Sequence, residues 1–278
     1  MPTEVHPAHC ERIAVEDPAE VAAANPIHDE KATGYGYAGA IVAGIHTYGW
    51  MVPAILDAVG DGWLSHGWAD VRFPRPVFVG DELVTEVVPS HDDPTIGRVT
   101  QHVESDGRIT IEGTIGLGDA PWFDEFELPE RRDAVPPATA PKYTPPELIP
   151  TYEDYPPMAV EIGADEARRW MHERIHDDDP RWNDGVPVVH PSWAPGQMTP
   201  LIRHSYKFPA GVHASGRIQH LALHRAGDPV TVAGRWGGVE VRKGKHWTTT
   251  DAIFTGPDGT DLSLIRQVAV IFPPLPRN

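Results

Sequence analysis

The sequence predicts an α+β protein of two related units, in which two long helices are each wrapped by a curved antiparallel β-sheet. Three observations support this prediction. A long apolar segment with helical character lies in the first half of the chain, alternating segments follow Gly-Asp turns in matching order in both halves, and a proline-rich stretch separates the halves. Since strands and helices with one apolar face must bury it, such segments pack in layers around a core.

The chain divides by composition into three parts. Residues 1–118 form the first unit, residues 119–189 a proline-rich linker with a short helix, and residues 190–278 the second unit. The linker has paired prolines at 136–137, 145–146 and 156–157, and proline disfavours helix interiors and central strands. We therefore expect this segment to lie over the surface, with its helix near residues 164–176.

Two pairs of turns suggest that the units arose by duplication. Gly80-Asp81 and Gly227-Asp228 lie 147 positions apart, and each precedes a strand-like segment. Asp106-Gly107 and Asp258-Gly259 lie 152 positions apart, and Asp-Gly between alternating segments is typical of a hairpin. The order of the features matches as well as their type, although any two β-rich units can share such turns.

The clearest helix candidate spans residues 38–59. It is apolar nearly all round, which is typical of a buried helix. Pro53 lies inside it, so we expect a kink or a break there.

Composition and charge exclude several classes of protein. The residues are 40% hydrophobic and 23% charged, as in globular proteins. The net charge of −17 argues against a nucleic-acid partner, because phosphate backbones recruit basic surfaces. No apolar run suits a membrane helix, the first 20 residues do not resemble a signal peptide, and the single Cys10 cannot form an internal disulfide. We expect a cytoplasmic protein.

Two motifs in the first unit carry a family resemblance. The first is Asn25-Pro26-Ile27-His28, followed by a Gly- and Tyr-rich turn at 34–37 and by the apolar segment around Gly44. The second, at residues 71–81, contains an Arg-Phe, a Pro-Val and a Gly-Asp in that order. Together, over about residues 15–118, they resemble the MaoC-like hydratase/dehydratase family. The resemblance implies a double hotdog fold, with the second unit as a non-catalytic half.

The resemblance also implies a reaction. The family adds water to a 2-enoyl thioester of coenzyme A or a carrier protein, or removes it from the 3-hydroxyacyl thioester. His28 would then be one member of an acid/base pair, Asn25 would position water or substrate, and the backbone N–H of Gly44 would hold the charge on the thioester oxygen. A helix start offers unpaired N–H groups and partial positive charge, which suits that last role.

Further expectations complete this interpretation. The enzyme would be a lyase of fatty acid or polyketide metabolism, without cofactor or metal, working as a homodimer or within a hetero-oligomer. We expect four more side chains to contact the substrate, namely Tyr37, His46, Trp63 and Arg72.

One position departs from the family pattern. The family has an aspartate two residues before the motif asparagine, as partner of the histidine, and Ala23 stands there in this chain. Alanine can neither accept a proton nor orient an imidazole. Asp29, Glu30 and His46 are the nearby side chains that could replace it.

Each motif residue also has a plain structural explanation. Asn25 and His28 could form a turn around Pro26, and Gly44 could be a packing glycine. Three histidines of the second unit, His213, His220 and His224, match no metal-ligand spacing well.

Three hypotheses on function follow. The first is a hydratase or dehydratase with an altered acid/base set built on His28. The second is an inactive double hotdog subunit whose partner carries the complete pair. The third is a repurposed hotdog enzyme, such as a thioesterase, cyclase or lyase of specialised metabolism.

Overall fold

The first half of the chain combines one long helix with five strands among the residues described. The computed structural model describes residues 4–17, 19–137 and 141–273. Its elements are β1 (Ala8–Ile13), α1 (Ala19–Ala24), the 3-10 helices η1 (Pro26–His28) and η2 (Glu30–Tyr35), α2 (Gly44–Val59), α3 (Trp63–His66), β2 (Gly67–Arg72), β3 (Glu82–Pro89), β4 (Ile96–Val103) and β5 (Ile109–Leu117).

The second half repeats this plan with shorter helices and longer strands. Its elements are η3 (Phe123–Glu125), η4 (Pro146–Leu148), β6 (Met158–Val160), α4 (Ala164–Trp170), the π-helical turn η5 (Met171–Ile175), α5 (Pro180–Asn183), α6 (Trp193–Gly196), α7 (Met198–Ser205), β7 (Ala210–His220), β8 (Val230–Arg242), β9 (Lys245–Thr255) and β10 (Asp261–Phe272).

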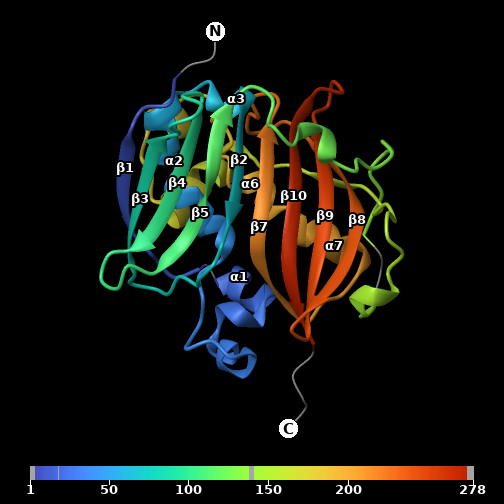
Figure 1. Ribbon diagram of the computed structural model, residues 1–278. Coiled ribbons are helices and arrows are strands. Elements are labelled where there is room, and N and C mark those ends of the chain that lie inside the picture. The colour runs from blue at the N-terminus through green and yellow to red at the C-terminus, as the bar shows by residue number, and fades with distance from the viewer. Residues whose placement is uncertain (1–3, 18, 138–140, 274–278) are drawn as a thin grey trace.

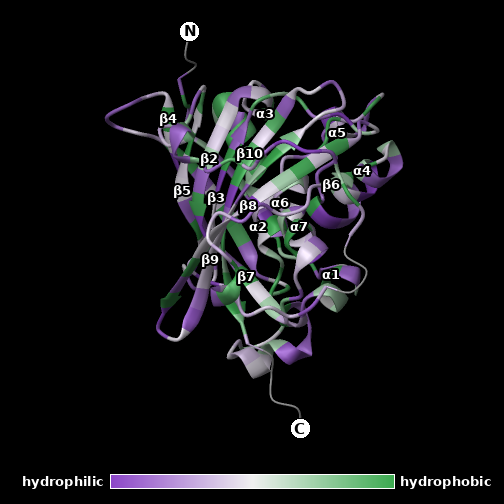
Figure 2. Cartoon of the chain, turned by 90° about the vertical axis from the view of Figure 1, so that its right-hand side faces the viewer, coloured by the Kyte–Doolittle hydropathy of each residue, from purple (hydrophilic) through white to green (hydrophobic). Residues whose placement is uncertain are grey.

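All these strands join one antiparallel sheet, which runs across the whole molecule (Figure 1). The order is β1-β3-β4-β5-β2-β7-β10-β9-β8-β6, so each half repeats the same order from its edge to the centre. There β2 and β7 pair and connect the halves. The helices lie on one face of the sheet (Figure 2), and the main core lies between these two layers.

The register at the centre supports a duplication. Asp70 of β2 stands opposite Arg217 of β7, and these positions lie 147 apart, as do Gly80 and Gly227. In an antiparallel pair with two-fold symmetry, the residue on the symmetry axis faces its own counterpart. Four turn glycines also share one conformation, with positive φ at Gly80, Gly107, Gly227 and Gly259, which glycine adopts without steric cost.

The long helix α2 begins later than the sequence suggested. It starts at Gly44, and the preceding residues are extended because the N–H groups of Ile41 and Val42 donate to the carbonyls of Ile27 and Val77. The expected break at Pro53 is absent, and the helix continues through it. A proline inside a helix costs about 3 kcal/mol. Burial of side chains such as Met51 and Ile55, worth about 1.5–3 kcal/mol each, offsets that cost.

The expectation of a second long helix is wrong. In its place the second unit has α6 and α7, four and eight residues long, separated at Gln197. Pro200 has no N–H to donate to the carbonyl of Gly196, so one continuous helix would leave that carbonyl without its intrahelical bond.

The first part of the segment expected to be a linker covers the other face of the sheet, and its later part, from α4 on, packs on the helix side. Trp122 and Phe126 pack there against Trp68, while the N–H of Ala120 donates to Gln219 Oε1. The segment also supplies strand β6, which pairs with β8, and the expected helix at 164–176 appears as α4 and the turn η5. Among the residues described, no helix has the length and apolar character needed to cross a membrane.

Candidate active site

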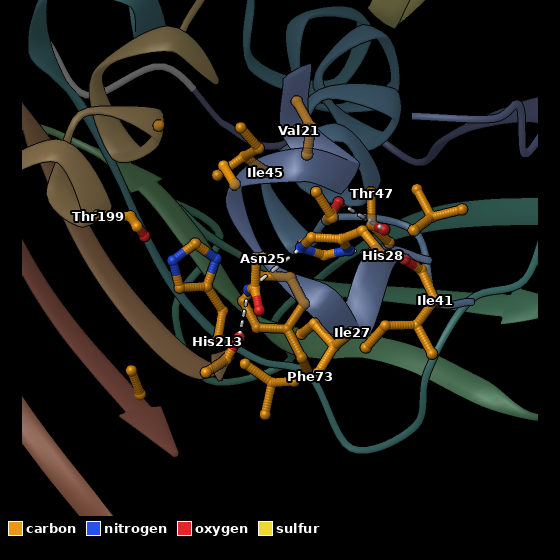
Figure 3. A pocket seen from close by; sticks show the side chains of 18 of the residues that line it. Val21, Asn25, Ile27, His28, Ile41, Ile45, Thr47, Phe73, Thr199 and His213 are labelled. Atoms are coloured by element: carbon orange, nitrogen blue, oxygen red, sulfur yellow. Dashed lines mark hydrogen bonds between the residues drawn. The ribbon is translucent and has the colours of Figure 1, made fainter. Parts of the chain in front are cut away.

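A cavity of about 460 Å³ lies where the two halves meet on the helix side of the sheet. The first half contributes η1, the start of α2 and the segment 73–77, and the second half contributes α7, β7 and β10. Most of the lining is apolar, with a few polar groups among it (Figure 3). An apolar cavity with few convergent polar groups is a typical site for a small-molecule or acyl ligand.

Asn25 opens the short helix η1 and ties the two halves together. Its extended backbone suits the residue before a proline, and Pro26 then takes the first helical position. The side-chain amide donates to the carbonyl of Gly211 on β7 at 2.8 Å and lies 3.5 Å from Nε2 of His28. Asn25 therefore places the motif helix against the second half.

The hydrogen bonds of His28 fix which ring nitrogen is basic. Nδ1 lies 2.7 Å from the carbonyl oxygen of Ile41, which can only accept, so Nδ1 carries the proton and Nε2 has the lone pair. Burial lowers the pKa of His28, against the opposing effects of the Ile41 hydrogen bond and of Asp17. The ring is therefore neutral near pH 7 and able to accept a proton at Nε2.

A carboxylate stands beside His28, although Ala23 occupies the position where the motif would place it. It belongs to Asp17, whose Oδ2 lies 3.3 Å from His28 Nδ1. The same carboxylate accepts from the N–H of Ala43 at 2.8 Å and contacts His46 Nδ1 at 2.5 Å. Its side chain is 3% exposed and lies behind the cavity wall.

The substitutes considered from the sequence take different places. Asp29 caps η2 and accepts from the N–H of Lys31 at 2.7 Å, and Glu30 is exposed. His46 does contact the carboxylate of Asp17, but it lies behind the cavity wall. No spacing pattern identifies Asp17, because it lies between β1 and α1 and only the folded chain brings it to His28.

Gly44 is the first residue of α2 and lines the cavity. Among the residues described, its N–H has no hydrogen-bond acceptor. The start of a 16-residue helix carries partial positive charge, so this N–H can stabilise a negatively charged oxygen. A methyl group at Gly44 would lie 3.3 Å from Cβ and Nδ1 of His213, a close approach that glycine permits.

His213 is a cavity residue that sequence reasoning weighed only as a metal ligand. It comes from β7 of the second half, and Figure 3 shows Asn25 between its ring and that of His28. Neither it nor the other histidines form a metal site, since no group of three His, Cys, Asp or Glu is arranged to hold a metal ion among the residues described.

The four residues expected to contact substrate lie in different parts of the structure, and only Tyr37 lines the cavity. Tyr37 lines the cavity and packs edge-on against Phe272. His46 lies behind the wall. Trp63 is fully buried in the core, and its indole N–H donates to the carbonyl of Trp68. Arg72 is exposed outside this cavity and pairs with Glu112 at 3.0 Å.

Charged side chains of both signs line the cavity, three arginines with Glu20 and Glu166. Arg75 and Arg203 line it, and neither forms an ion pair with a carboxylate among the residues described. Arg203 donates to the carbonyl of Ala24 at 2.6 Å, and burial lowers its pKa. Arg174 also lines the cavity but pairs with Glu20 at 2.6 Å.

Comparisons with known proteins give one family match, in the first half of the chain. The family model of the MaoC like domain matches residues 22–110, which include Asn25, His28 and Gly44. Among curated proteins, none matches the chain.

Solved structures match nearly the whole chain at low identity. A chain from Chloroflexus aurantiacus described as a MaoC domain protein dehydratase has a TM-score of 0.63 at 13% identity, covering 99% of this chain and 96% of that one. Rv0216 of Mycobacterium tuberculosis, a conserved hypothetical protein with a double hotdog fold, has 0.59 at 13%, covering 97% of each. A protein from Lactobacillus plantarum described as an oleoyl thioesterase has 0.52 at 11%, covering 97% and 98%.

The matches to solved structures show the fold of the whole chain, and the family model covers only part of the first half. The chain therefore has the double hotdog fold, and its residues 22–110 match the family model of the MaoC like domain.

Proposed function

We propose that the protein adds water to a 2-enoyl thioester and catalyses the reverse dehydration. The observation that carries the proposal is the placement of His28. Its Nδ1 is held by Ile41 and Asp17, its Nε2 is basic, and the N–H of Gly44 lines the same cavity. The MaoC like domain spans these residues, which supports the same reaction class.

His28 acts as the base that activates water. As Nε2 takes a proton, the oxygen of the water bonds to C3 of the enoyl group. The imidazolium that forms is stabilised by the carboxylate of Asp17, 3.3 Å from Nδ1. A positioned base contributes about 10²- to 10⁴-fold to the rate of such a step.

The electron pair of the broken C2–C3 double bond moves to the thioester oxygen. The enolate so formed accepts a hydrogen bond from the N–H of Gly44, at the positive end of α2. The proton on His28 then passes to C2, which restores the neutral imidazole and yields the 3-hydroxyacyl thioester. Asn25 serves as a positioning residue, since it contacts His28 and Gly211 together.

We propose a thioester of coenzyme A or a carrier protein as the substrate. The apolar lining suits an acyl chain, and Arg75 and Arg203 offer positive charge to the phosphate groups of either carrier. The homodimer and the cytoplasmic location stay predictions.

Thioester hydrolysis is a second candidate. The same base and the same Gly44 donor would serve attack of water on the thioester carbon, and one structural relative is described as a thioesterase. The inactive-subunit hypothesis receives less support, because a carboxylate does stand beside His28.

The test is the loss of enoyl absorbance from crotonyl and longer 2-enoyl thioesters of coenzyme A. We expect turnover by the native protein and a decrease of about 10²- to 10⁴-fold in His28→Ala, because the base is lost. His91→Ala, at a fully exposed histidine, is the matched control and should keep native activity. A thiol reagent added in parallel reports hydrolysis. Both reactions remove the enoyl-thioester band, but hydration releases no thiol, so a release of free coenzyme A equal to the loss of absorbance would transfer the assignment to a thioesterase.

A further inference from the structure

The imidazole of His213 packs against Gly44. An ideal Cβ built on Gly44 would stand 3.3 Å from His213 Nδ1, so this nitrogen lies over the first residue of α2. The two residues come from different halves of the chain, His213 from β7 and Gly44 from α2. Both line the cavity. An oxygen atom held by the Gly44 N–H would therefore lie close to the His213 ring.

The side chain of His213 has no polar partner in the part of the chain that the structure describes. Among the residues described, its side chain forms no hydrogen bond and no ion pair, and its ring packs near Phe73 with centroids 6.5 Å apart. Burial, and then the nearby His28, lower the pKa of His213 to about 4. The ring is neutral near pH 7, with one N–H to donate.

We propose that His213 donates a second hydrogen bond to the thioester oxygen, so that the two halves of the chain together assemble the oxyanion site. The inference rests on the proposed hydration and adds a catalytic residue to it. When water adds to C3, the electron pair that reaches the oxygen is shared between the Gly44 N–H and the His213 N–H. It returns to C2 as His28 delivers its proton there. The second half is then part of the catalytic machinery.

Neutrality of His213 matters for this role. A neutral imidazole donates without adding a fixed positive charge that would raise the cost of protonating His28 nearby. Removing one donor from an oxyanion site lowers the rate by about 10²- to 10³-fold. We expect a decrease of that size in kcat for His213→Ala, with little change in KM.

Acetoacetyl-coenzyme A tests the donor directly, because its enolate absorbs in the ultraviolet and the hydratase reaction does not consume it. The measurement is the pH at which the enolate band of acetoacetyl-coenzyme A appears when the ligand is bound to the native protein, to His213→Ala or to His213→Asn. The native protein should lower this pH relative to free ligand. His213→Ala should raise it by about one unit, equal to a tenfold change in the equilibrium. His213→Asn, which can still donate, should restore part of the effect.

His66→Ala is the matched control. His66 is the counterpart of His213 at the 147-position spacing, and its side chain is exposed outside the cavity. This variant should titrate like the native protein.

The outcomes separate the two proposals. If hydration is absent but the enolate titration shifts in His213→Ala, the proposed reaction fails and the donor role stands. An enolate that titrates alike on native protein and His213→Ala would overturn the donor role, even if hydration slows, since a merely structural wall residue would behave in that way. A native protein that leaves the enolate pH unchanged from free ligand would overturn it as well.

Discussion

Asp17 connects three groups at the scale of single residues. Its carboxylate contacts the N–H of Ala43, Nδ1 of His46 and Nδ1 of His28. Because Ala43 immediately precedes Gly44, one carboxylate positions both the base and the start of the oxyanion-binding helix. The same charge favours the protonated form of His28 during the reaction.

Replacement of this charge tests that account. In Asp17→Asn the pKa of His28 should fall further below its ordinary value, since Asp17 is among the groups that raise it. His28 accepts a proton only while neutral, so kcat/KM should fall as the pH drops through this pKa. The variant should move this acidic limb to lower pH. It should also reduce the plateau of kcat/KM by about tenfold or more, because a loss of one pKa unit is about 1.4 kcal/mol.

The measurement is the pH profile of kcat/KM for a 2-enoyl thioester. Asp92→Asn, at an almost fully exposed carboxylate, is the matched control and should follow the native profile. A native-like acidic limb in Asp17→Asn would show that the carboxylate does not act on His28.

At the scale of elements, strand β2 holds the two halves together. It pairs with β5 on one side and with β7 on the other, so the cavity between the halves depends on its position. β5 approaches β2 closely at Gly113, which faces Val71. A Cβ at Gly113 would lie 2.0 Å from the carbonyl oxygen of Asp70, and backbone cannot yield as a side chain can.

Gly113→Ala should therefore destabilise the protein, although glycine is unfavourable in strands in general. We expect the free energy of unfolding to decrease by about 1–3 kcal/mol, the usual cost of overpacking. Urea unfolding followed by tryptophan fluorescence measures it. Gly39→Ala, where nothing lies within 4 Å of the new methyl group, should change little. Equal stability of the two variants would contradict the close approach of β5 and β2.

At the scale of the whole molecule, buried histidines connect stability to pH. His190 packs edge-on against Trp182 and His220 against Trp63, and Nε2 of each has no partner among the residues described. Burial lowers the pKa of His190 to about 3 and that of His220 to about 4. Both rings are thus neutral in the folded protein.

The sign of the pH effect follows from these directions. In the unfolded chain a histidine has a pKa of about 6.5, so below that pH the unfolded state binds more protons than the folded state. Stability is then fully present above about pH 6.5 and falls by about 1.4 kcal/mol per pH unit for each such group. We expect the free energy of unfolding to decline steeply between about pH 6.5 and about pH 4.

Urea unfolding at several pH values in this window measures the slope. His220→Gln removes one titrating group and should reduce the slope by about 1.4 kcal/mol per pH unit, whatever its effect on stability at neutral pH. His91→Gln, at an exposed position, should leave the slope unchanged. A native slope in His220→Gln would mean that this ring is protonated in the fold.

Much of the molecule is determined by local sequence pattern. The Gly-Asp and Asp-Gly turns, the alternating strands and the Asn25–His28 motif are local features, governed by backbone conformation and side-chain periodicity over a few residues. They were sufficient to predict the α+β class and the two related halves. The family resemblance that they carry pointed to Asn25, His28, Tyr37 and Gly44, all of which line the cavity, while their roles stay predictions. Local pattern failed where a competing partner was distant, as at the start of α2, whose preceding N–H groups bond to Ile27 and Val77.

Only the tertiary structure decided which groups meet at the site. Asp17 and His213 lie outside the motif in sequence, and chain folding over many residues brings them to His28 and Gly44. Trp63 and Arg72 lie close to motif elements in the sequence, yet one enters the core and the other faces solvent. Spacing along the chain determines contacts only within an element. The pairing of β2 with β7 determines them between the two halves, and that pairing comes from the packing of the whole sheet.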